Sequence, residues 1–165
     1  MPIGATGGGS TKLFIKIDGI KGESAYTKWK DKDCSDIDSF SMGSNANWNF
    51  TTGGKSSSGS VGFSGVQVSR SLVGATPVLF IGCLKEQKTK KVEIYLGNET
   101  GGDPFFTVEL SGEVRITADQ IAGSTGGDLI ENVVFTAPKI LVKRGDISCD
   151  INFQDVEGKN NDISM

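Results

Sequence analysis

The chain has 165 residues, of which 36% are hydrophobic, a length and composition that suit one domain with a single core. Its formal net charge is -3, from 20 acidic and 17 basic residues spread along the chain, so it lacks the basic field that draws a protein onto nucleic acid. No apolar run approaches the roughly 20 residues of a membrane-spanning helix, and the first residues lack the basic and apolar regions of a signal peptide. We therefore expect synthesis and folding in the cytoplasm, with no nucleic-acid partner and no membrane insertion.

The 23 glycines, in a chain of short alternating apolar runs, favour strands joined by turns over long helices. Residues 1–11 are small and glycine-rich and are predicted to form a flexible arm. Residues 12–18 alternate between aliphatic and largely polar side chains, with Phe14 among the latter, and predict the first strand. Residues 19–34 are polar and predict a surface loop, which includes Trp29.

A second strand is predicted over residues 36–42, where side chains on alternate positions share a face. Phe40 and Met42 lie on the face that can join a core. The opposite face is small and only weakly apolar, and its side chains are Ile37, Ser39 and Ser41.

Residues 43–60 are rich in glycine, serine and asparagine and predict a long loop. A structureless loop of this length is uncommon in a compact domain and tends to be functional. Trp48 and Phe50 within it are either partly buried anchors of the loop or part of an interaction surface.

The second half of the chain predicts one helix and several more strands. After a strand over residues 61–68, Thr76 suits a helix N-cap and Pro77 the first helical position. The helix that follows is apolar almost all round, so it should pack closely against a sheet. Further strands are predicted over residues 92–96, 105–116, 129–142 and 147–153, before a polar tail at 154–165.

The sequence predicts no catalytic, cofactor or metal site. It has no histidine, which removes the commonest general base and most zinc sites. Gly53-Gly54-Lys55-Ser56 invites comparison with a phosphate-binding loop, but the glycine that this motif needs five positions earlier is Asn49. Asp36 and Asp38 share a strand face without a third ligand, which is typical of solvated carboxylates.

The three cysteines are Cys34, Cys83 and Cys149, which are far apart in the sequence and odd in number. This pattern predicts free thiols rather than a disulfide framework. Cys83 falls within the apolar helix, where a buried structural thiol is favoured over a nucleophile.

Four stretches carry a family resemblance when they are taken together and in order. They are residues 14–24 (Phe-Ile-Lys-Ile-Asp-Gly-Ile-Lys-Gly-Glu-Ser), Phe40-Ser41-Met42-Gly43, Ala75-Thr76-Pro77 and Glu131-Asn132-Val133. Taken as a set, they resemble the haemolysin-coregulated protein (Hcp) family, the inner-tube protein of type VI secretion systems. The chain departs from the family in having Met42 where tryptophan is frequent, a longer N-terminal arm and no histidine.

The resemblance implies a mainly β fold over residues 12–153, a single β-barrel of two antiparallel sheets with one α-helix packed on its side. It also implies homohexameric rings with a wide channel, which stack into a tube inside a contractile sheath behind a spike. Such a tube carries or chaperones effector proteins in its lumen and is propelled out of the bacterial cell without a signal peptide.

The same resemblance gives expectations for individual residues. Ile37, Ser39 and Ser41 are expected to line the lumen. The loop that holds Asn45, Trp48, Phe50 and Lys55 is expected to reach the next ring. Two alternatives stay open at this point: a tube protein of a related contractile injection machine or phage tail and, less favoured because no catalytic set exists, an effector enzyme built on this domain.

Overall fold

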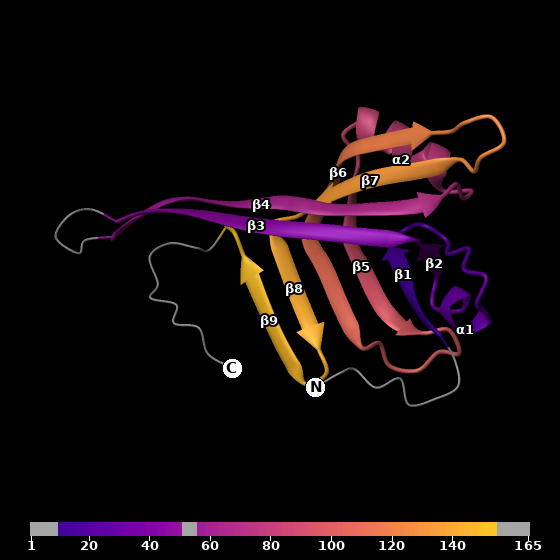
Figure 1. Ribbon diagram of the computed structural model, residues 1–165, viewed down its shortest axis with the longest axis horizontal. Coiled ribbons are helices and arrows are strands. Elements are labelled where there is room, and N and C mark those ends of the chain that lie inside the picture. Colours follow the sequence, from indigo (N-terminus) through magenta and orange to yellow (C-terminus); the bar gives the residue numbers. More distant parts are fainter. Residues whose placement is uncertain (1–9, 51–55, 155–165) are drawn as a thin grey trace.

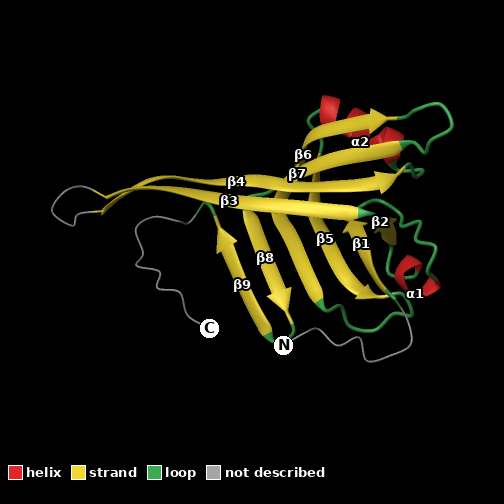
Figure 2. Ribbon diagram, in the orientation of Figure 1, coloured by secondary structure: helices red, strands yellow, loops and turns green. Residues whose placement is uncertain are grey.

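The computed structural model describes residues 10–50 and 56–154, with side chains described for residues 10–46 and 62–154. Figures 1 and 2 show a protein made mostly of antiparallel strands, with one short helix at the upper right of the view and another at the lower right. In chain order the elements are β1 (Thr11–Ile17), α1 (Thr27–Lys30), β2 (Cys34–Ile37), β3 (Ser39–Phe50), β4 (Ser56–Ser71), α2 (Thr76–Leu84), β5 (Lys88–Asn98), β6 (Phe106–Ala122), β7 (Ile130–Thr136), β8 (Lys139–Arg144) and β9 (Ile147–Asn152).

The strands belong to one sheet with the order β2-β1-β5-β6-β7-β4-β3, to which β8 is added beside β6 and β9 beside β8. β6 is 17 residues long and bends where its register with β5 shifts, near Gly112 (φ +81°) and Glu113 (φ +92°). We call β3, β4, β7 and residues 115–122 of β6 the upper strands. The remaining strands, with residues 106–111 of β6, are the lower strands, which the upper strands cross in Figure 1.

The expected barrel of two sheets with one helix is wrong in detail. The described strands form a single sheet that is not closed, and α1 is a second helix. The reason is the corner at Asp38, whose backbone N–H donates to the carbonyl of Ser69 at 2.9 Å. The chain there leaves β1 and joins β4, so the two end strands, β2 and β3, are not hydrogen-bonded to each other in the sheet.

The main core lies between the upper and lower strands. Aliphatic side chains of the two sets, together with Phe135 and Leu79 of α2, are excluded from water. Burying each such side chain contributes about 1.5–3 kcal/mol. The most buried members are Ile15, Val66, Val68, Val92, Ile94, Val108, Leu110, Val114, Val133 and Phe135.

A second, aromatic cluster lies on the other side of β1. Phe14 stacks on Trp29 with 4.1 Å between ring centroids, and the Trp29 indole N–H donates to the Asn98 carbonyl at 2.8 Å. A Cβ on Gly97 would come within 2.5 Å of the indole, so this position needs glycine. The predicted surface loop at 19–34 is therefore corrected: it contains α1, which buries Trp29 and makes β1 a strand covered on both sides.

Helix α2 begins near the expected residue but is capped differently. Its N-cap is Ala75, and the Thr76 hydroxyl accepts from the Val73 N–H and donates to Glu131 Oε2 at 2.9 Å. The helix packs on one side against β6, and Leu84 on the other side is 71% exposed. The prediction of close packing therefore holds for one face only.

Three strand boundaries also differ from the predictions. The loop expected at 43–60 lies largely in the long β3–β4 hairpin, which has two register shifts. The strand expected at 36–42 is divided at Asp38, and the one expected at 129–142 is divided before Lys139 into β7 and β8. Within the described residues, neither helix has the length and hydropathy needed to span a membrane.

Candidate assembly surfaces

The exposed side of the upper strands carries a continuous set of uncharged side chains. Directly paired residues of antiparallel strands point to the same side of a sheet. One cross-strand row runs from Ser39 through Ser69 and Asn132 to Gln120, and the next from Ser41 through Gln67 and Val134 to Ala118. We call this surface the uncharged face; its members are Ser39, Ser41, Gln67, Ser69, Ser71, Ala118, Gln120, Ala122, Ile130, Asn132 and Val134.

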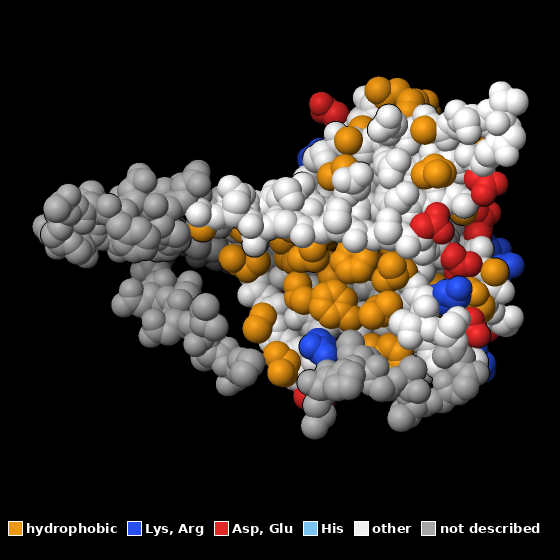
Figure 3. Space-filling model, in the orientation of Figure 1, with side chains coloured by type: hydrophobic (Ala, Val, Ile, Leu, Met, Phe, Trp, Pro, Cys, Tyr) orange, Lys and Arg blue, Asp and Glu red, His pale blue; other side chains and the backbone are white. Residues whose placement is uncertain are grey.

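Figure 3 shows the uncharged face as a broad band of white with a few apolar side chains over β3, β4 and β7, whereas charged side chains gather toward its ends. Most of its serines and both glutamines are exposed. Small hydroxyl and amide side chains can exchange hydrogen bonds with water or with a passing protein without a charge of either sign. Such a surface is suited to weak, non-selective contact.

Apart from Arg115 at the bend of β6, whose side chain is 47% exposed, the charged residues described on these strands lie on the opposite side, which faces the core. Arg70 of β4 is paired in register with Glu131 of β7, and the two side chains are 2% and 0% exposed. Arg70 Nε donates to Glu131 Oε2 at 2.8 Å, and the Thr76 hydroxyl donates to the same oxygen. Burial, with the Glu131 carboxylate beside it, raises the pKa of Asp119 on β6 to about 7.

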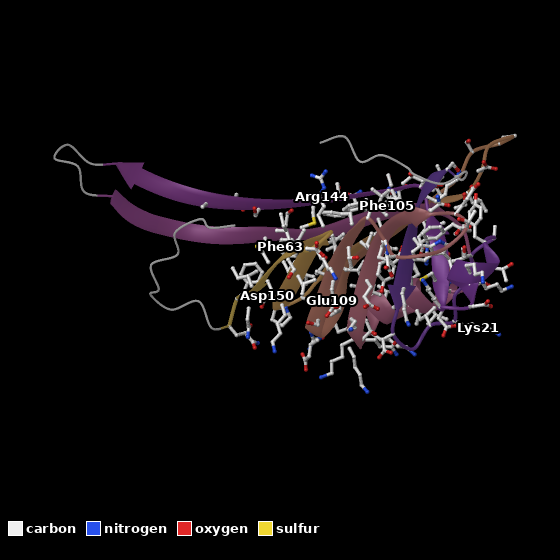
Figure 4. All side chains as sticks on the ribbon, turned by 90° about the horizontal axis from the view of Figure 1, so that it is seen from below. Lys21, Phe63, Phe105, Glu109, Arg144 and Asp150 are labelled. Atoms are coloured by element: carbon white, nitrogen blue, oxygen red, sulfur yellow. The ribbon has the colours of Figure 1, made fainter. Side chains whose placement is uncertain are left out.

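The exposed side of the lower strands is charged. A cross-strand row runs from Lys16 of β1 through Glu93 and Glu109 to Leu141 and Asp150. Figure 4 shows Glu109 and Asp150 on one side of these strands and Arg144 on the other. We call this surface the charged face; its charged members include Lys16, Lys91, Glu93, Glu109, Lys139, Lys143 and Asp150.

One lysine connects two carboxylates of the charged face. Lys91 Nζ lies 3.5 Å from a carboxylate oxygen of Glu93 and 3.5 Å from one of Glu109. The attraction of Glu93, and then of Glu109, raises the pKa of Lys91. Because the lysine side chain is 44% exposed, this pairing contributes little to stability.

The upper strands have two open edges. β3 pairs with β4 alone among the described strands, and residues 116–122 of β6 pair with β7 alone. Below β3, Figure 3 shows an apolar patch. A cleft of about 380 Å³ opens there, and its apolar lining consists of Met42, Phe63, Ile140, Val142, Ile151 and Phe153. Unpaired strand edges beside apolar surface favour association with another chain.

The residues expected to face a lumen do not all share one surface. Ser39 and Ser41 are exposed on the uncharged face. Ile37 is 7% exposed and packs in the main core, because the corner at Asp38 separates it from β3. Its side chain is therefore not part of the exposed surface that holds the two serines.

The residues expected to contact a neighbouring ring lie toward the far end of the β3–β4 hairpin. Asn45 is exposed and is paired with Gly62, and in the backbone register Trp48 lies opposite Ser58 and Phe50 opposite Ser56. Lys55 and the side chains of Trp48 and Phe50 lie outside the described residues.

Sequence reasoning missed the buried charges and most of the uncharged face. The signal for the first was present: Arg70 continues the buried alternation of Val66 and Val68, and Glu131 that of Val133 and Phe135. A charged residue at a core position of a strand points to a buried ion pair. The signal for the uncharged face was the uncharged residue at the intervening positions, which on β4 is Gln67, Ser69 and Ser71.

The cysteine and acidic side chains are the remaining candidates for catalytic or metal chemistry. The three cysteines are free, as predicted, and burial raises the pKa of the Cys34 thiol to about 11, which leaves it unreactive. In the part of the chain that the structure describes, no group of three or more acidic, cysteine or histidine side chains could hold a metal ion.

Solved structures with the same fold indicate the class of protein to which this chain belongs. A type VI secretion system effector from Yersinia pestis is 25% identical, with a TM-score of 0.62 over 85% of this chain and 98% of that chain. Hcp1 from Salmonella typhimurium is 19% identical, with a TM-score of 0.65 over 88% and 96%. A protein described as a type six secretion system protein reaches a TM-score of 0.70 at 21% identity, over 81% and 83%. Comparison with curated proteins found no match.

Two of these three neighbours are described as type VI secretion proteins and the third as an Hcp protein, and all three share the fold of this chain. The family model described as "Type VI secretion system effector, Hcp" matches residues 14–143. The chain belongs to the Hcp family and is a tube protein of the type VI secretion system. Hcp proteins are structural and are secreted by this system.

Proposed function

We propose that this tube protein forms hexameric rings whose channel is lined by the uncharged face, and that the rings stack into the tube. The observation that supports this most is the combination of that face with an open strand edge on each side of it. The edge of β3 in one copy can pair with residues 116–122 of β6 in the next. A ring closed in this way leaves no unpaired edge on the upper strands.

The chemistry of the uncharged face suits a channel that carries proteins. A lumen of one charge would hold cargo of the opposite charge and repel cargo of the same charge. Ser39 and Ser41 leave room and offer only neutral hydrogen bonds. We propose that effector proteins are carried in this lumen, and that the sheath and spike proteins of the secretion system are further partners. The charged face, across the core, then points away from the channel.

Electron microscopy and light scattering test the assembly. Purified protein is expected to appear as uniform rings or tubes in negative stain, with a scattering mass several times the 17.4 kDa of the chain. A monomer at micromolar concentration would overturn the proposal. The protein is expected in the bacterial cytoplasm before firing and in the culture medium afterwards, which immunoblotting of the two fractions can follow.

A bulky charge on the uncharged face tests its role as the lumen wall. Ser41→Arg is expected to leave the ring mass unchanged and to lower the effectors in the medium of the bacterium that makes this protein at least several-fold, measured by mass spectrometry. Ser148→Arg, an exposed serine on β9, is the matched control and should leave release unchanged. Equal release by the two variants would place the lumen elsewhere.

The β3–β4 hairpin is proposed to contact the next ring. Asn45 and Gly62 are paired in register, so residues 46–61 can be replaced by an Asn–Gly turn that closes a shorter hairpin. This variant is expected to form rings of normal mass that no longer stack, as seen by electron microscopy. Tubes of normal length would show that the removed segment is not needed for stacking.

A further inference from the structure

An unusual set of polar atoms is buried beneath the uncharged face. Within the described residues, four buried side-chain nitrogen or oxygen atoms have no hydrogen-bond partner. All four belong to one cluster: Nη2 of Arg70, Oε1 of Glu131 and both carboxyl oxygens of Asp119. A buried polar group without a partner is costly, and native proteins keep few of them. Their concentration at one place calls for a specific explanation.

The two carboxyl groups are neighbours across the β6–β7 pair. Asp119 is paired with Val133, and Glu131 is paired with Ile121, so the two acidic side chains lie diagonally on the same, inner side of the sheet. Oε2 of Glu131 already accepts hydrogen bonds from Arg70 and Thr76, whereas Oε1 has no donor. Both Asp119 oxygens lack a donor as well.

We propose that Asp119 and Glu131 share one proton, and that the hydrogen bond made by this proton links the end of β6 to the buried group of Arg70, Glu131 and Thr76. We call these four residues, joined in this way, the clasp. The Asp119 carboxyl O–H donates to Oε1 of Glu131, which supplies the missing partner for one oxygen on each residue. Glu131 stays ionised because two donors hold its other oxygen. The cluster then carries one negative and one positive charge, which is a balanced set for a buried site.

The surrounding groups favour Asp119 as the proton carrier. Its charged and titratable neighbours are Glu131 of β7, which opposes its ionisation, and Arg70 of β4, which favours it more weakly. From α2 the cluster receives the neutral Thr76 hydroxyl. Burial and the like charge together raise the pKa of Asp119 to about 7, so the proton is exchanged near neutral pH.

Loss of the proton removes the balance of charge in the cluster. The proton passes to water, and two adjacent carboxylates then face a single guanidinium. Since the pKa of Asp119 is higher in the folded protein than in the unfolded chain, the contribution of this group to stability is fully present at low pH and is lost as the pH rises toward 7. The clasp joins β6, β7, β4 and α2, so the end of β6 becomes less firmly held when the proton leaves.

The position of the clasp has a consequence for assembly that rests on the proposed function. Asp119 lies within residues 116–122 of β6, the open edge proposed to receive β3 of the next copy. Ring closure should therefore be favoured when the clasp is protonated, which makes assembly weaker on the alkaline side of neutrality.

Infrared spectroscopy of protein labelled with ¹³C in its aspartate carboxyl groups tests the proton directly. The carbonyl band of a protonated aspartic acid is expected at pH 6 and should disappear with a midpoint near pH 7. The band should be missing from Asp119→Asn and retained in Asp103→Asn, which changes an exposed carboxylate in a turn. Absence of the band from the labelled wild-type protein at pH 5 would overturn the proposal, whether or not the variant folds.

The linkage to stability gives a second measurement. Between pH 5 and 6.5, the folding equilibrium constant of the wild type is expected to fall about tenfold per pH unit relative to Asp119→Asn, because one proton is bound in the folded state and released on unfolding. The asparagine amide can donate to Glu131 at any pH, so this component should vanish. An unchanged pH dependence in Asp119→Asn would contradict the shared proton.

Light scattering at pH 6 and pH 8 then separates the two proposals. At limiting concentration, the ring fraction of the wild type should fall at least several-fold between these pH values, and that of Asp119→Asn should stay constant. Rings of equal amount at both pH values would reject the link to assembly. If no rings form at either pH, the proposed function fails, while the infrared titration still decides the proton site.

Discussion

The upper and lower strands distribute charge in opposite ways. The upper strands hold Arg70 and Glu131 on their buried side, and Arg115 at the bend of β6 is the one charged side chain described on their outside. The lower strands bury aliphatic side chains and carry Lys91, Glu93 and Glu109 on their outer side. Both sets use the same period-two alternation. The comparison shows that alternation determines which residues share a side, while the tertiary fold decides which side is buried.

The difference also suggests what each surface is for. Burying an ion pair is costly, and a more ordinary sheet would put those charges in water. In the upper strands this cost accompanies a neutral outer surface, which the proposed lumen requires. The lower strands follow the common pattern of a surface exposed to water. Substitutions in the two regions should therefore differ sharply in their effect on stability.

The largest effect is expected beneath the uncharged face. Arg70→Met leaves Glu131 ionised and without its buried partner, which should lower the free energy of unfolding by about 3–5 kcal/mol. Urea unfolding at one fixed protein concentration measures this change. Arg115→Met is the control, since the side chain of Arg115 is 47% exposed, and its cost should stay below about 1 kcal/mol.

A double variant sharpens this test. Adding Glu131→Leu to Arg70→Met removes the unpaired charge, so the double variant should be more stable than Arg70→Met alone. If the double variant were less stable, or if Arg70→Met cost no more than Arg115→Met, the cluster would contribute little to the fold.

The smallest effect is expected on the charged face. Lys91→Met removes two partly exposed ion pairs, each 3.5 Å long, and should lower the free energy of unfolding by less than about 1 kcal/mol. The loss should shrink when the salt concentration is raised, because salt screens exposed charges. Lys90→Met on the same strand is the control. A loss as large as that of Arg70→Met would remove the contrast between the two regions.

Local sequence patterns predicted much of the fold. Period-two alternation located β1, β5 and most of β6, and Pro77 located the start of α2. The four ordered stretches indicated the Hcp family, which the match over residues 14–143 confirms. The long hairpin was missed because its glycines, serines and asparagines have low intrinsic strand propensity, and only pairing of β3 with β4 makes them strands.

The candidate surfaces were only partly predictable for the same reason. Ser39 and Ser41 share a face by local geometry, so spacing alone placed them on the same side of the strand, and the fold leaves that side exposed. Ile37 was assigned to that face because no local signal marked the corner at Asp38. The hydrogen bond that stabilises this corner is donated by the Asp38 N–H to the carbonyl of Ser69, a residue distant in the sequence.

By itself, the sequence determined the mainly β class, the free thiols, the family and the neutral character of alternate positions on several strands. Only the tertiary structure decided that the sheet stays open, that Phe14 and Trp29 stack outside the main core, and that Asp119 meets Glu131. Cross-strand register depends on which distant strands pair. A one-residue change of register moves every side chain of a strand to the other side of the sheet. Contacts of that kind are set by the packing of the whole chain rather than by any short stretch of it.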